Sequence, residues 1–439
     1  MFAGCGSGRR PALMAGIALA AVGTAGEAQA SGYALLEQST EAQGASYAGS
    51  GARADDPSTL FYNPAGMTRL PGYQVSLSGA FILPQAVLES GTSYAGGTTG
   101  RDAGENVLLP SLYATAQIAP DWHVGLAITS PFGLATKYDA ASIARYYAQT
   151  TSLTTINIAP SVAWQPLPVL SVAAALRVEV ADARLSQAVD FGSVVNGFIP
   201  GYPGYAPGRI ANDGLATVKG NDAAVGWQVG LLYQPAPGTR LGFDYRSAIY
   251  HKLSGSMAFG NVPQGLPLPL QQALSATFAG GPATAKLVTP DTLSLSVAQD
   301  IGPVTLLGGV DYTLWSHFKT LMVNYTGPAF DIQENWRDTV MLSAGADWHV
   351  AADWTLRGGF AFDETPTRDA NRTPRIPDAN RYWLSVGATW KPIPRLALSA
   401  AYSHIFVDNS TVNLTSNGSL SAGFNNQIDI LSAEATLSF

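Results

Sequence analysis

The sequence is short of charge, and this shortage limits the classes of protein it can encode. Only 13% of the 439 residues are charged, whereas a soluble domain carries roughly 25%. The formal net charge is -7, so the chain lacks the basic surplus that a nucleic-acid partner requires. Hydrophobic residues make up 46% of the chain. We therefore expect a protein that contacts an apolar environment and binds no nucleic acid.

Cysteine and long apolar runs are also scarce. The single cysteine, Cys5, lies in the N-terminal segment, so the chain beyond it can form no disulfide and has no thiolate chemistry. Beyond that segment no run approaches the ~20 apolar residues of a membrane-spanning helix. Low charge without such helices is typical of a transmembrane β-barrel, in which alternation dilutes the apolar residues. A soluble all-β protein is the alternative.

The first thirty residues have the three parts of an export signal. Arg9 and Arg10 form a positive start, and Ala12–Ala21 forms a short apolar stretch. Ala28-Gln29-Ala30 is a small-x-small cleavage site, so we expect the mature chain to begin near Ser31. Export, low charge and the absence of cysteine from the mature chain predict the outer membrane of a Gram-negative bacterium.

Several segments alternate with a period of two, which is typical of β-strands. In Val225–Tyr233 the odd positions are large and apolar, and the even positions include Gly226, Gln228 and Gly230. Further segments behave in the same way, namely Val340–Val350, Trp354–Asp363 and Tyr382–Trp390. In a barrel the apolar face meets lipid and the other face lines the lumen.

Connections between the strands fall into two classes. Six are short and marked by Pro or Asp, at 119–121, 165–168, 234–238, 300–303, 350–353 and 391–394. Seven are longer and rich in Gly, Asn, Ser and Thr, near 88–105, 138–150, 192–219, 260–286, 326–335, 367–379 and 414–423. Six turns and seven loops join fourteen strands. The sequence therefore predicts an all-β fold, a 14-stranded antiparallel transmembrane barrel.

Aromatic residues stand beside the short turns, where a girdle at the periplasmic membrane interface is expected. They are Trp122, Trp164, Tyr233, Trp348, Trp354 and Trp390. The last segment also alternates and ends in Phe439, as is common among barrels of the outer membrane. Ordinary core aromatics are the alternative interpretation of these positions.

The segment before Tyr73 is not strand-like. It contains Asn63-Pro64-Ala65-Gly66, in which Pro lacks a backbone donor and Gly tolerates positive φ. From these residues alone, the stretch is a turn or a loop before the first strand.

Taken together, the motifs resemble the long-chain fatty acid outer-membrane transporter family (FadL-like), which includes toluene and xylene uptake channels. The resemblance covers the mature chain and is carried by Gly44–Tyr47, Gly51–Asp56, Asn63-Pro64-Ala65, Thr129–Thr136, Gly226-Trp227, Asp244–Ser247, Trp315–Phe318, Trp354–Pro366 and Arg375–Ser385. It implies a barrel closed from inside by an N-terminal hatch. The domains would be a signal peptide (1–30), the hatch (31–72) with Asn63, Pro64 and Ala65 as its signature, and the barrel (73–439).

The third predicted strand, Trp122–Tyr138, is interrupted by Ser130-Pro131-Phe132-Gly133. Pro removes a ladder donor, and a nearby Gly indicates a bulge or bend. A strand that ends early in a loop is the alternative. The resemblance implies an inward kink that opens a lateral window, through which an apolar substrate leaves sideways into the bilayer.

Two outer loops are unusually apolar, and exposed apolar surface often marks a binding site. Their candidate ligand-contacting residues are Phe191 and Phe198 in one loop, and Leu266, Leu268, Leu270, Leu274 and Phe278 in the other. Leu270, Leu274 and Phe278 follow i, i+4 and i+8 spacing, which predicts one face of a short helix. An irregular loop packed on the barrel rim is the alternative. By resemblance, the two loops form a capture groove.

A fatty acid carboxylate needs a basic partner, because an unpaired buried charge is costly. At the positions where family members carry ligand-facing basic residues, this sequence has Gln187 and Ile332-Gln333. Nearby candidates that could replace them are Arg184, Lys319 and Arg337. The head group stays open at this point, and a neutral hydrocarbon, an aromatic compound or an ester is an alternative substrate.

We therefore predict an outer-membrane channel for hydrophobic small molecules, long-chain fatty acids or related hydrocarbons and aromatics, driven by the downhill gradient. The expected partners are this substrate, outer-membrane lipid and lipopolysaccharide, with the protein a monomer. We expect no enzyme activity, no cofactor and no metal, since the five histidines are scattered. A general diffusion porin is the main alternative. An outer-membrane lipase using Ser403-His404 is more remote, since no G-x-S-x-G elbow is present.

Overall fold

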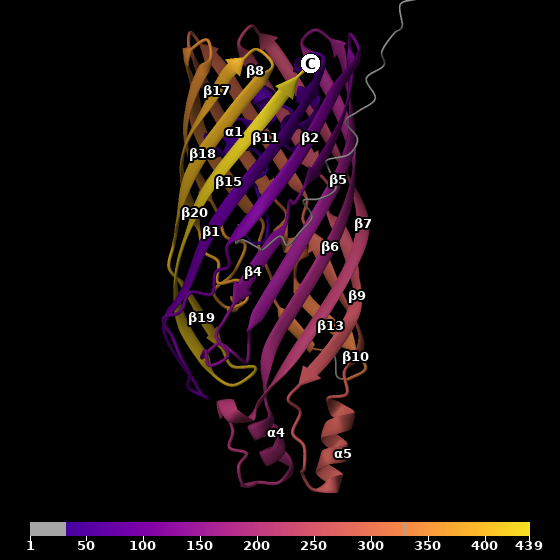
Figure 1. Ribbon diagram of the computed structural model, residues 1–439, viewed down its shortest axis with the longest axis vertical. Helices are drawn as coiled ribbons and strands as arrows, with labels where there is room; N and C mark the ends of the chain where they lie inside the picture. The colour runs from indigo at the N-terminus through magenta and orange to yellow at the C-terminus, as the bar shows by residue number, and fades with distance from the viewer. Residues whose placement is uncertain (1–31, 328–329) are drawn as a thin grey trace, which may run out of the picture.

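The computed structural model describes residues 32–327 and 330–439, so the predicted signal peptide lies outside the described residues. Antiparallel strands form a closed barrel, in which β1 (Tyr73–Ser93) pairs along its length with β20 (Leu420–Ser438) (Figure 1). Across the described part of the chain, the helices are too short or too polar to span a membrane.

The barrel has the fourteen strands that the sequence predicts. Eight are continuous: β1, β2 (Val107–Ala119), β5 (Thr150–Leu167), β6 (Leu170–Asp190), β7 (Asp213–Ala236), β16 (Trp354–Asp363), β17 (Arg381–Ile393) and β20. Six are interrupted: β3 (Trp122–Thr129) with β4 (Gly133–Lys137), β8 (Thr239–Arg246) with β9 (Ile249–Gly260), β10 (Gly281–Thr289) with β11 (Thr292–Ile301), β12 (Val304–Thr313) with β13 (Thr320–Tyr325), β14 (Phe330–Gln333) with β15 (Thr339–Ala351), and β18 (Leu396–Val407) with β19 (Ser410–Leu414).

The side-chain alternation predicted for the wall is confirmed. In β7 the odd positions point outward, and Val225 and Trp227 are 65% and 50% exposed. Gln228 and Leu232, at even positions, are buried toward the lumen. The outward face of this strand is therefore the apolar one, as a lipid environment requires.

The six predicted tight turns lie at one end of the barrel, which is also where the chain ends at Phe439 (Figure 1, top). Exposed tryptophans stand beside them. Trp122 and Trp164 stack with ring centroids 5.6 Å apart, and Trp354 and Trp390 stack at 6.0 Å. This ring of aromatic side chains marks the periplasmic membrane interface.

Only one of the six strand interruptions, the one at 130–132, was expected from the sequence. Another lies between β10 and β11, where Pro290 has no backbone donor to offer to the ladder. Its neighbour Asp291 accepts a hydrogen bond from Ala248 N at 3.0 Å, so a carboxylate replaces the missing strand partner. Between β12 and β13, the 3₁₀ turn η3 (Trp315–His317) buries Trp315.

Residues 32–72, here called the hatch segment, occupy the lumen near the turn end of the barrel (Figure 1). Their short helices are α1 (Thr40–Gln43), α2 (Ser50–Arg53), α3 (Thr59–Tyr62) and η1 (Pro64–Arg69). Wall glycines create the space they need. A Cβ on Gly230 would lie 2.1 Å from Asn63 Oδ1, and one on Gly359 would lie 2.1 Å from the Ala45 carbonyl oxygen. A filled lumen differs from the open one that the porin alternative requires.

Buried ion pairs fasten the hatch segment to the wall. The Arg357 guanidinium lies 2.7 Å from Glu41 Oε2, and Arg53 lies 2.9 Å from Asp347 Oδ2. Glu41 Oε1 also accepts a hydrogen bond from Ser399 at 2.9 Å. All of these side chains are nearly excluded from solvent. Because each charge is compensated only by its partners, the removal of one partner leaves a buried charge unpaired.

We predict that Arg357→Leu loosens the hatch segment, because it leaves the Glu41 carboxylate with one fewer cation. Removal of one partner of a buried pair costs about 3–5 kcal/mol. Planar-bilayer recordings should show rare, small openings for the unaltered protein and frequent, larger openings for the variant. Lys391→Leu, at an exposed position on the same end of the barrel, is the control and should leave conductance unchanged. Indistinguishable recordings for Arg357→Leu would show that this pair does not fasten the segment.

Candidate substrate-binding site

Two cavities lie in the lumen on the extracellular side of the hatch segment. The inner cavity has a volume of about 710 Å³ and borders the hatch segment through Ala34, Leu35, Leu36, Glu37 and Phe61. The outer cavity has a volume of about 740 Å³, and its wall is mainly aliphatic, with Leu134, Leu153, Leu253, Leu287, Leu321 and Ile376. Lumenal cavities that are lined largely by apolar side chains are typical of sites for small hydrophobic ligands.

An aromatic cluster separates the two cavities. Tyr33 stands at its centre, with ring centroids 4.7 Å from Trp315, 5.4 Å from Trp336 and 5.6 Å from Phe318. The Tyr33 hydroxyl donates a hydrogen bond to the Val288 carbonyl on β10. The Tyr33 ring, which belongs to the N-terminal end of the hatch segment, therefore lies between the inner and the outer cavity.

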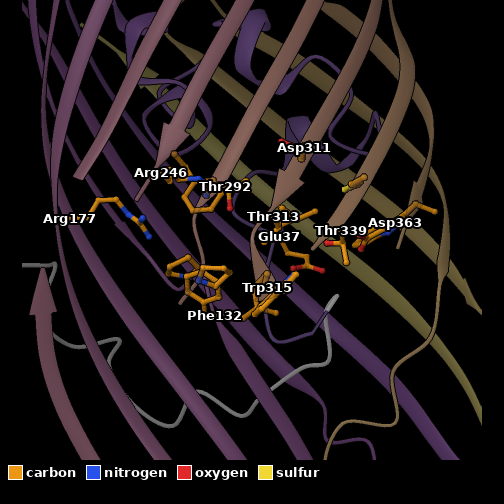
Figure 2. A pocket seen from close by; sticks show the side chains of 18 residues that line it. Glu37, Phe132, Arg177, Arg246, Thr292, Asp311, Thr313, Trp315, Thr339 and Asp363 are labelled. Atoms are coloured by element: carbon orange, nitrogen blue, oxygen red, sulfur yellow. The ribbon is translucent and has the colours of Figure 1, made fainter. Parts of the chain in front are cut away.

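The inner cavity contains charges of both signs. Figure 2 shows Arg177 and Arg246 on one side, Asp363 on the opposite side and Glu37 between them. The Arg246 guanidinium lies over the Phe61 ring, 4.5 Å from its centroid. Burial raises the pKa of the Glu37 carboxyl to about 7. The inner cavity thus combines a largely apolar wall with buried charges of both signs.

The outer cavity carries a buried cation, Arg375. Its Nη2 donates to Gln187 Oε1 at 2.7 Å, and its Nη1 makes long contacts to Thr151 Oγ1 (3.3 Å) and to the Ser186 carbonyl (3.4 Å). Its Nε is buried without a hydrogen-bond partner among the described residues. All of its acceptors are neutral. Glu334 lines the same cavity but accepts from Trp336 Nε1 at 3.0 Å and forms no ion pair with Arg375.

Arg375 reaches the lumen because the connection between β16 and β17 folds inward. The hydroxyl of Tyr138 donates to the Pro374 carbonyl at 2.6 Å, and Thr136 Oγ1 donates to the Arg375 carbonyl at 3.2 Å. Asp378 of the same connection accepts from the backbone N–H of Gly32 at 3.1 Å. The sequence reading placed this stretch among the outer loops and missed Arg375, although Arg375 begins the Arg375–Ser385 motif.

The interruption in the third strand leaves a gap in the ladder. Residues Val107–Ser111 of β2 pair with β1, but the β2–β3 pairing stops at Leu112, and β4 pairs with β5. The hatch segment takes the place of the missing strand neighbour and contacts the free edge at residues 131–133. Leu35 N donates to the Pro131 carbonyl at 2.8 Å, and Gly133 N donates to the Tyr33 carbonyl at 2.9 Å.

Gln38 joins both edges of this gap. Its side-chain Nε2 donates to the Ser130 carbonyl at 2.8 Å, and its Oε1 accepts from Ser130 N at 3.2 Å and from Ser111 Oγ at 2.8 Å. Its backbone carbonyl accepts from the Tyr113 hydroxyl at 2.8 Å. Gln38 is fully buried. Sequence analysis did not single out this residue, because one glutamine in a non-strand segment carries no local signal.

The Asn63-Pro64-Ala65 motif holds a turn against the wall. Asn63 Oδ1 accepts from Ala65 N at 3.1 Å and caps η1, with Pro64 at the helix start, where its missing N–H is not needed. Asn63 Nδ2 donates to the Gly51 carbonyl at 2.7 Å and to the Leu231 carbonyl of β7 at 2.9 Å. One side chain thus satisfies the turn and fixes it to the barrel.

The three basic residues considered as carboxylate partners do not line either cavity. Arg184 is exposed on the outward face of β6. Lys319 is exposed just before β13. Arg337 is exposed, and its Nε donates to the Thr365 carbonyl at 3.1 Å. Gln187, by contrast, faces inward and accepts the hydrogen bond from Arg375.

The two apolar loops project beyond the barrel, opposite the turn end, as helices α4 (Phe191–Phe198) and α5 (Leu268–Thr277) (Figure 1). Leu270 and Leu274 are buried in a cluster that also contains Leu266 and, partly buried, Phe278. The Phe191 and Phe278 rings meet at 4.9 Å. Two apolar side chains point to solvent, Phe198 (57% exposed) and Leu268 (69% exposed).

The adjacent pair Ser403-His404 is split by the alternation of β18. Ser403 is buried on the lumen side with its Oγ 2.7 Å from Ser385 Oγ. His404 lies on the other face with its Nδ1 2.8 Å from Asp429 Oδ1. The two side chains therefore cannot act as a nucleophile and its base. Within the described residues there is also no cluster of three His, Cys, Asp or Glu that could hold a metal ion.

A closed barrel with an internal segment and lumenal cavities defines a class of outer-membrane channels. Residues 21–439 match the family described as outer membrane protein transport protein (OMPP1/FadL/TodX), and the chain belongs to this family. An outer membrane protein of Neisseria meningitidis serogroup B is 30% identical over 98% of both chains. The long-chain fatty acid transport protein of Escherichia coli K12 is 29% identical over 85% of this chain and 87% of its own.

A solved structure agrees with this assignment. The crystal structure of a Pseudomonas aeruginosa FadL homologue superposes with a TM-score of 0.84 at 26% identity, covering 93% of this chain and 99% of that one. The protein is thus an outer-membrane β-barrel of a transport family. The family description and the name of the E. coli relative both refer to transport.

We predict that Gln38→Ala frees both edges of the gap, because Ser130 and Ser111 lose their shared buried partner. An unsatisfied buried polar group costs about 1–3 kcal/mol. Hydrogen–deuterium exchange should become faster at the backbone amides of Leu35 and Gly133. The matched control is Gln427→Ala, a partly exposed outward glutamine whose side-chain Nε2 donates to Gln85 Oε1 at 2.7 Å. Unchanged exchange at these amides would show that Gln38 does not hold the gap closed.

Proposed function

We propose that this protein takes up long-chain carboxylates, with fatty acids as the substrate class, and that Arg375 holds the carboxylate in the outer cavity. The observation that carries the proposal is a buried guanidinium beside an aliphatic chamber, with no carboxylate within ion-pair distance among the described residues. The family membership and the named E. coli relative support the same substrate class.

The energetics favour an anionic ligand at this position. An unpaired buried charge costs several kcal/mol, and a carboxylate that accepts two parallel guanidinium bonds offsets much of that cost. Arg375 Nε has no partner, and the Nη1 contacts of 3.3 Å and 3.4 Å are long for a charged donor. The leucines of the outer cavity would then receive the hydrocarbon chain, whose burial contributes about 0.8 kcal/mol per CH₂.

The proposed entry begins at the two apolar loops. Phe198 and Leu268 expose apolar surface beyond the barrel, while the neighbouring Leu270 and Leu274 hold the two loop helices together. An exposed apolar surface on a rigid support can concentrate an amphipathic molecule before it enters the lumen. The substrate would pass from there to the outer cavity.

The proposed exit is lateral, through the gap between β2 and β4. One short stretch of the hatch segment controls both steps, because Tyr33 separates the cavities and Gln38 bridges the gap. A ligand that displaces Tyr33 would pull on the backbone that pairs with Pro131 and Gly133. Substrate binding would thereby weaken the contacts that close the wall, and no energy source beyond the downhill gradient is required.

The substrate class can be tested with Arg375→Met, which keeps an unbranched apolar stem in place and removes the charged guanidinium. We expect uptake of oleate to fall at least tenfold in a strain that depends on this protein. Uptake of toluene, which has no carboxylate, should stay within twofold of the unaltered protein. Arg337→Met, at an exposed position outside both cavities, is the matched control and should affect neither substrate.

Equal losses for oleate and toluene would contradict a carboxylate-binding role and indicate a structural defect. Unchanged uptake of both would contradict the assignment of Arg375. Toluene uptake that depends on the protein, together with oleate uptake that does not, would favour a neutral hydrocarbon as the substrate.

The lateral exit is tested by straightening the third strand with Pro131→Val and Gly133→Val. A restored ladder should reduce oleate uptake at least tenfold, while heat-modifiable mobility shows that the barrel still assembles. A Cβ at Gly133 would lie 2.7 Å from Leu35 Cδ1, so Leu35→Ala is combined with the pair to relieve the clash. Leu35→Ala alone is the control. Normal uptake in an assembled triple variant would rule out the lateral exit.

A further inference from the structure

Four basic side chains form a patch on the outer wall of the barrel. Arg184 lies on β6, Lys219 on β7, Lys252 on β9 and Lys286 on β10, and all four are exposed. The four strands are neighbours in the sheet and lie side by side in Figure 1. We call these residues the basic wall patch.

The sheet register places these cations against each other. Arg184 is directly opposite Lys219, and Lys252 is directly opposite Lys286. Directly opposite side chains on one face have Cβ atoms about 5 Å apart, and like charges at such positions are destabilising. The register therefore places two pairs of like charges on adjoining strands of the outer wall.

The protein offers little compensation of its own. None of the four takes part in an ion pair within 4.0 Å among the described residues. One acid, Asp182, is exposed on the same face of β6. Elsewhere on the outer wall, β1 and β20 instead carry amides and an acid, with Asn425 Nδ2 donating to Glu89 Oε1 at 2.9 Å. The positive surface is therefore local to one side of the barrel.

The patch lies at the height of the outer-leaflet head groups. On the same strands Val180, Val225 and Tyr250 are exposed, apolar and closer to the turn end. With a rise of about 3.3 Å per residue and a tilt of about 40°, Arg184 lies roughly 35 Å from the turn end of β6. The apolar band of such barrels is only about 25 Å tall, so the cations stand above it.

We propose that the basic wall patch binds the phosphate groups of lipopolysaccharide in the outer leaflet. Lipopolysaccharide carries phosphates on a lipid anchor, so its acyl chains lie against the apolar belt while its phosphates reach the cations above. Paired basic side chains and phosphate oxygens are complementary in charge and in hydrogen bonding. The patch lies on the outward face of its strands, although Lys219 also borders the outer cavity, and the proposal does not depend on the identity of the transported molecule.

The test uses the full-length purified protein and lipid A that carries two phosphates. Native mass spectrometry and a titration in detergent measure retention and affinity. The variant Arg184→Gln/Lys219→Gln/Lys252→Gln/Lys286→Gln should bind at least tenfold more weakly. Lys219→Arg/Lys252→Arg/Lys286→Arg, which keeps the charge, should bind as the unaltered protein does. Lys391→Gln/Arg395→Gln, with exposed basic residues at the turn end, is the matched control.

Dephosphorylated lipid A and high salt complete the test, because both remove the electrostatic attraction. Equal affinity of the four-residue variant and the unaltered protein, or equal binding of dephosphorylated lipid A, would overturn the proposal. Slower oleate uptake with unchanged lipid A affinity would also overturn it and would assign the patch to substrate attraction. If the four-residue variant does not assemble, the two cross-strand pairs are changed separately, and each should weaken binding about threefold.

Discussion

The structure depends on the hydrogen bonds of one buried side chain, that of Gln38, across a gap in the barrel wall. A barrel avoids free strand edges by closure, and here the interruption at 130–132 leaves a stretch without its neighbour. Gln38 supplies an acceptor to Ser111 and both a donor and an acceptor to Ser130. The wall is complete only while the hatch segment stays in place, so the position of that segment and the integrity of the wall are coupled.

The architecture was predictable because it rests on local, repeated signals. Alternation of apolar and polar residues identifies the strands, and the turns marked by Pro and Asp show where one strand ends and the next begins. Aromatic residues mark one membrane interface. The number of fourteen strands therefore followed from the sequence. The interruptions were harder, since they depend on partners distant in the chain, such as Asp291 accepting from Ala248. The inward path of the 364–380 connection was hard to predict for the same reason, because it also depends on partners distant in the chain. It is held by Tyr138 and by Gly32, whose proximity no local pattern expresses.

The candidate site likewise contains some residues that could be predicted from local sequence signals and others that could not. The interruption at Pro131 was visible as a proline within an alternating segment, and Asn63-Pro64-Ala65 was visible as turn chemistry. Arg375 was not, because its place in the lumen follows from the folding of a loop. Arg184 could have been excluded as a lumenal residue, since it shares the even parity of Leu176 and Val180 on the apolar face of β6. The period-two rule that identified the strand also fixed the direction of this side chain.

The low charge of the sequence acquires a specific meaning in this fold. A charge near lipid or in a sealed lumen is costly unless an opposite charge accompanies it. We therefore look for a partner of opposite charge beside each charged side chain in these places. Glu41 and Arg357 meet each other between the hatch segment and the wall. Among the described residues no carboxylate lies within ion-pair distance of Arg375 in the lumen, where Glu334 acts on it only at longer range, and the cross-strand pair of Arg184 and Lys219 outside has no ion-pair partner. We propose that molecules the protein encounters supply these counter-charges, a substrate carboxylate inside the barrel and a phosphorylated lipid around it.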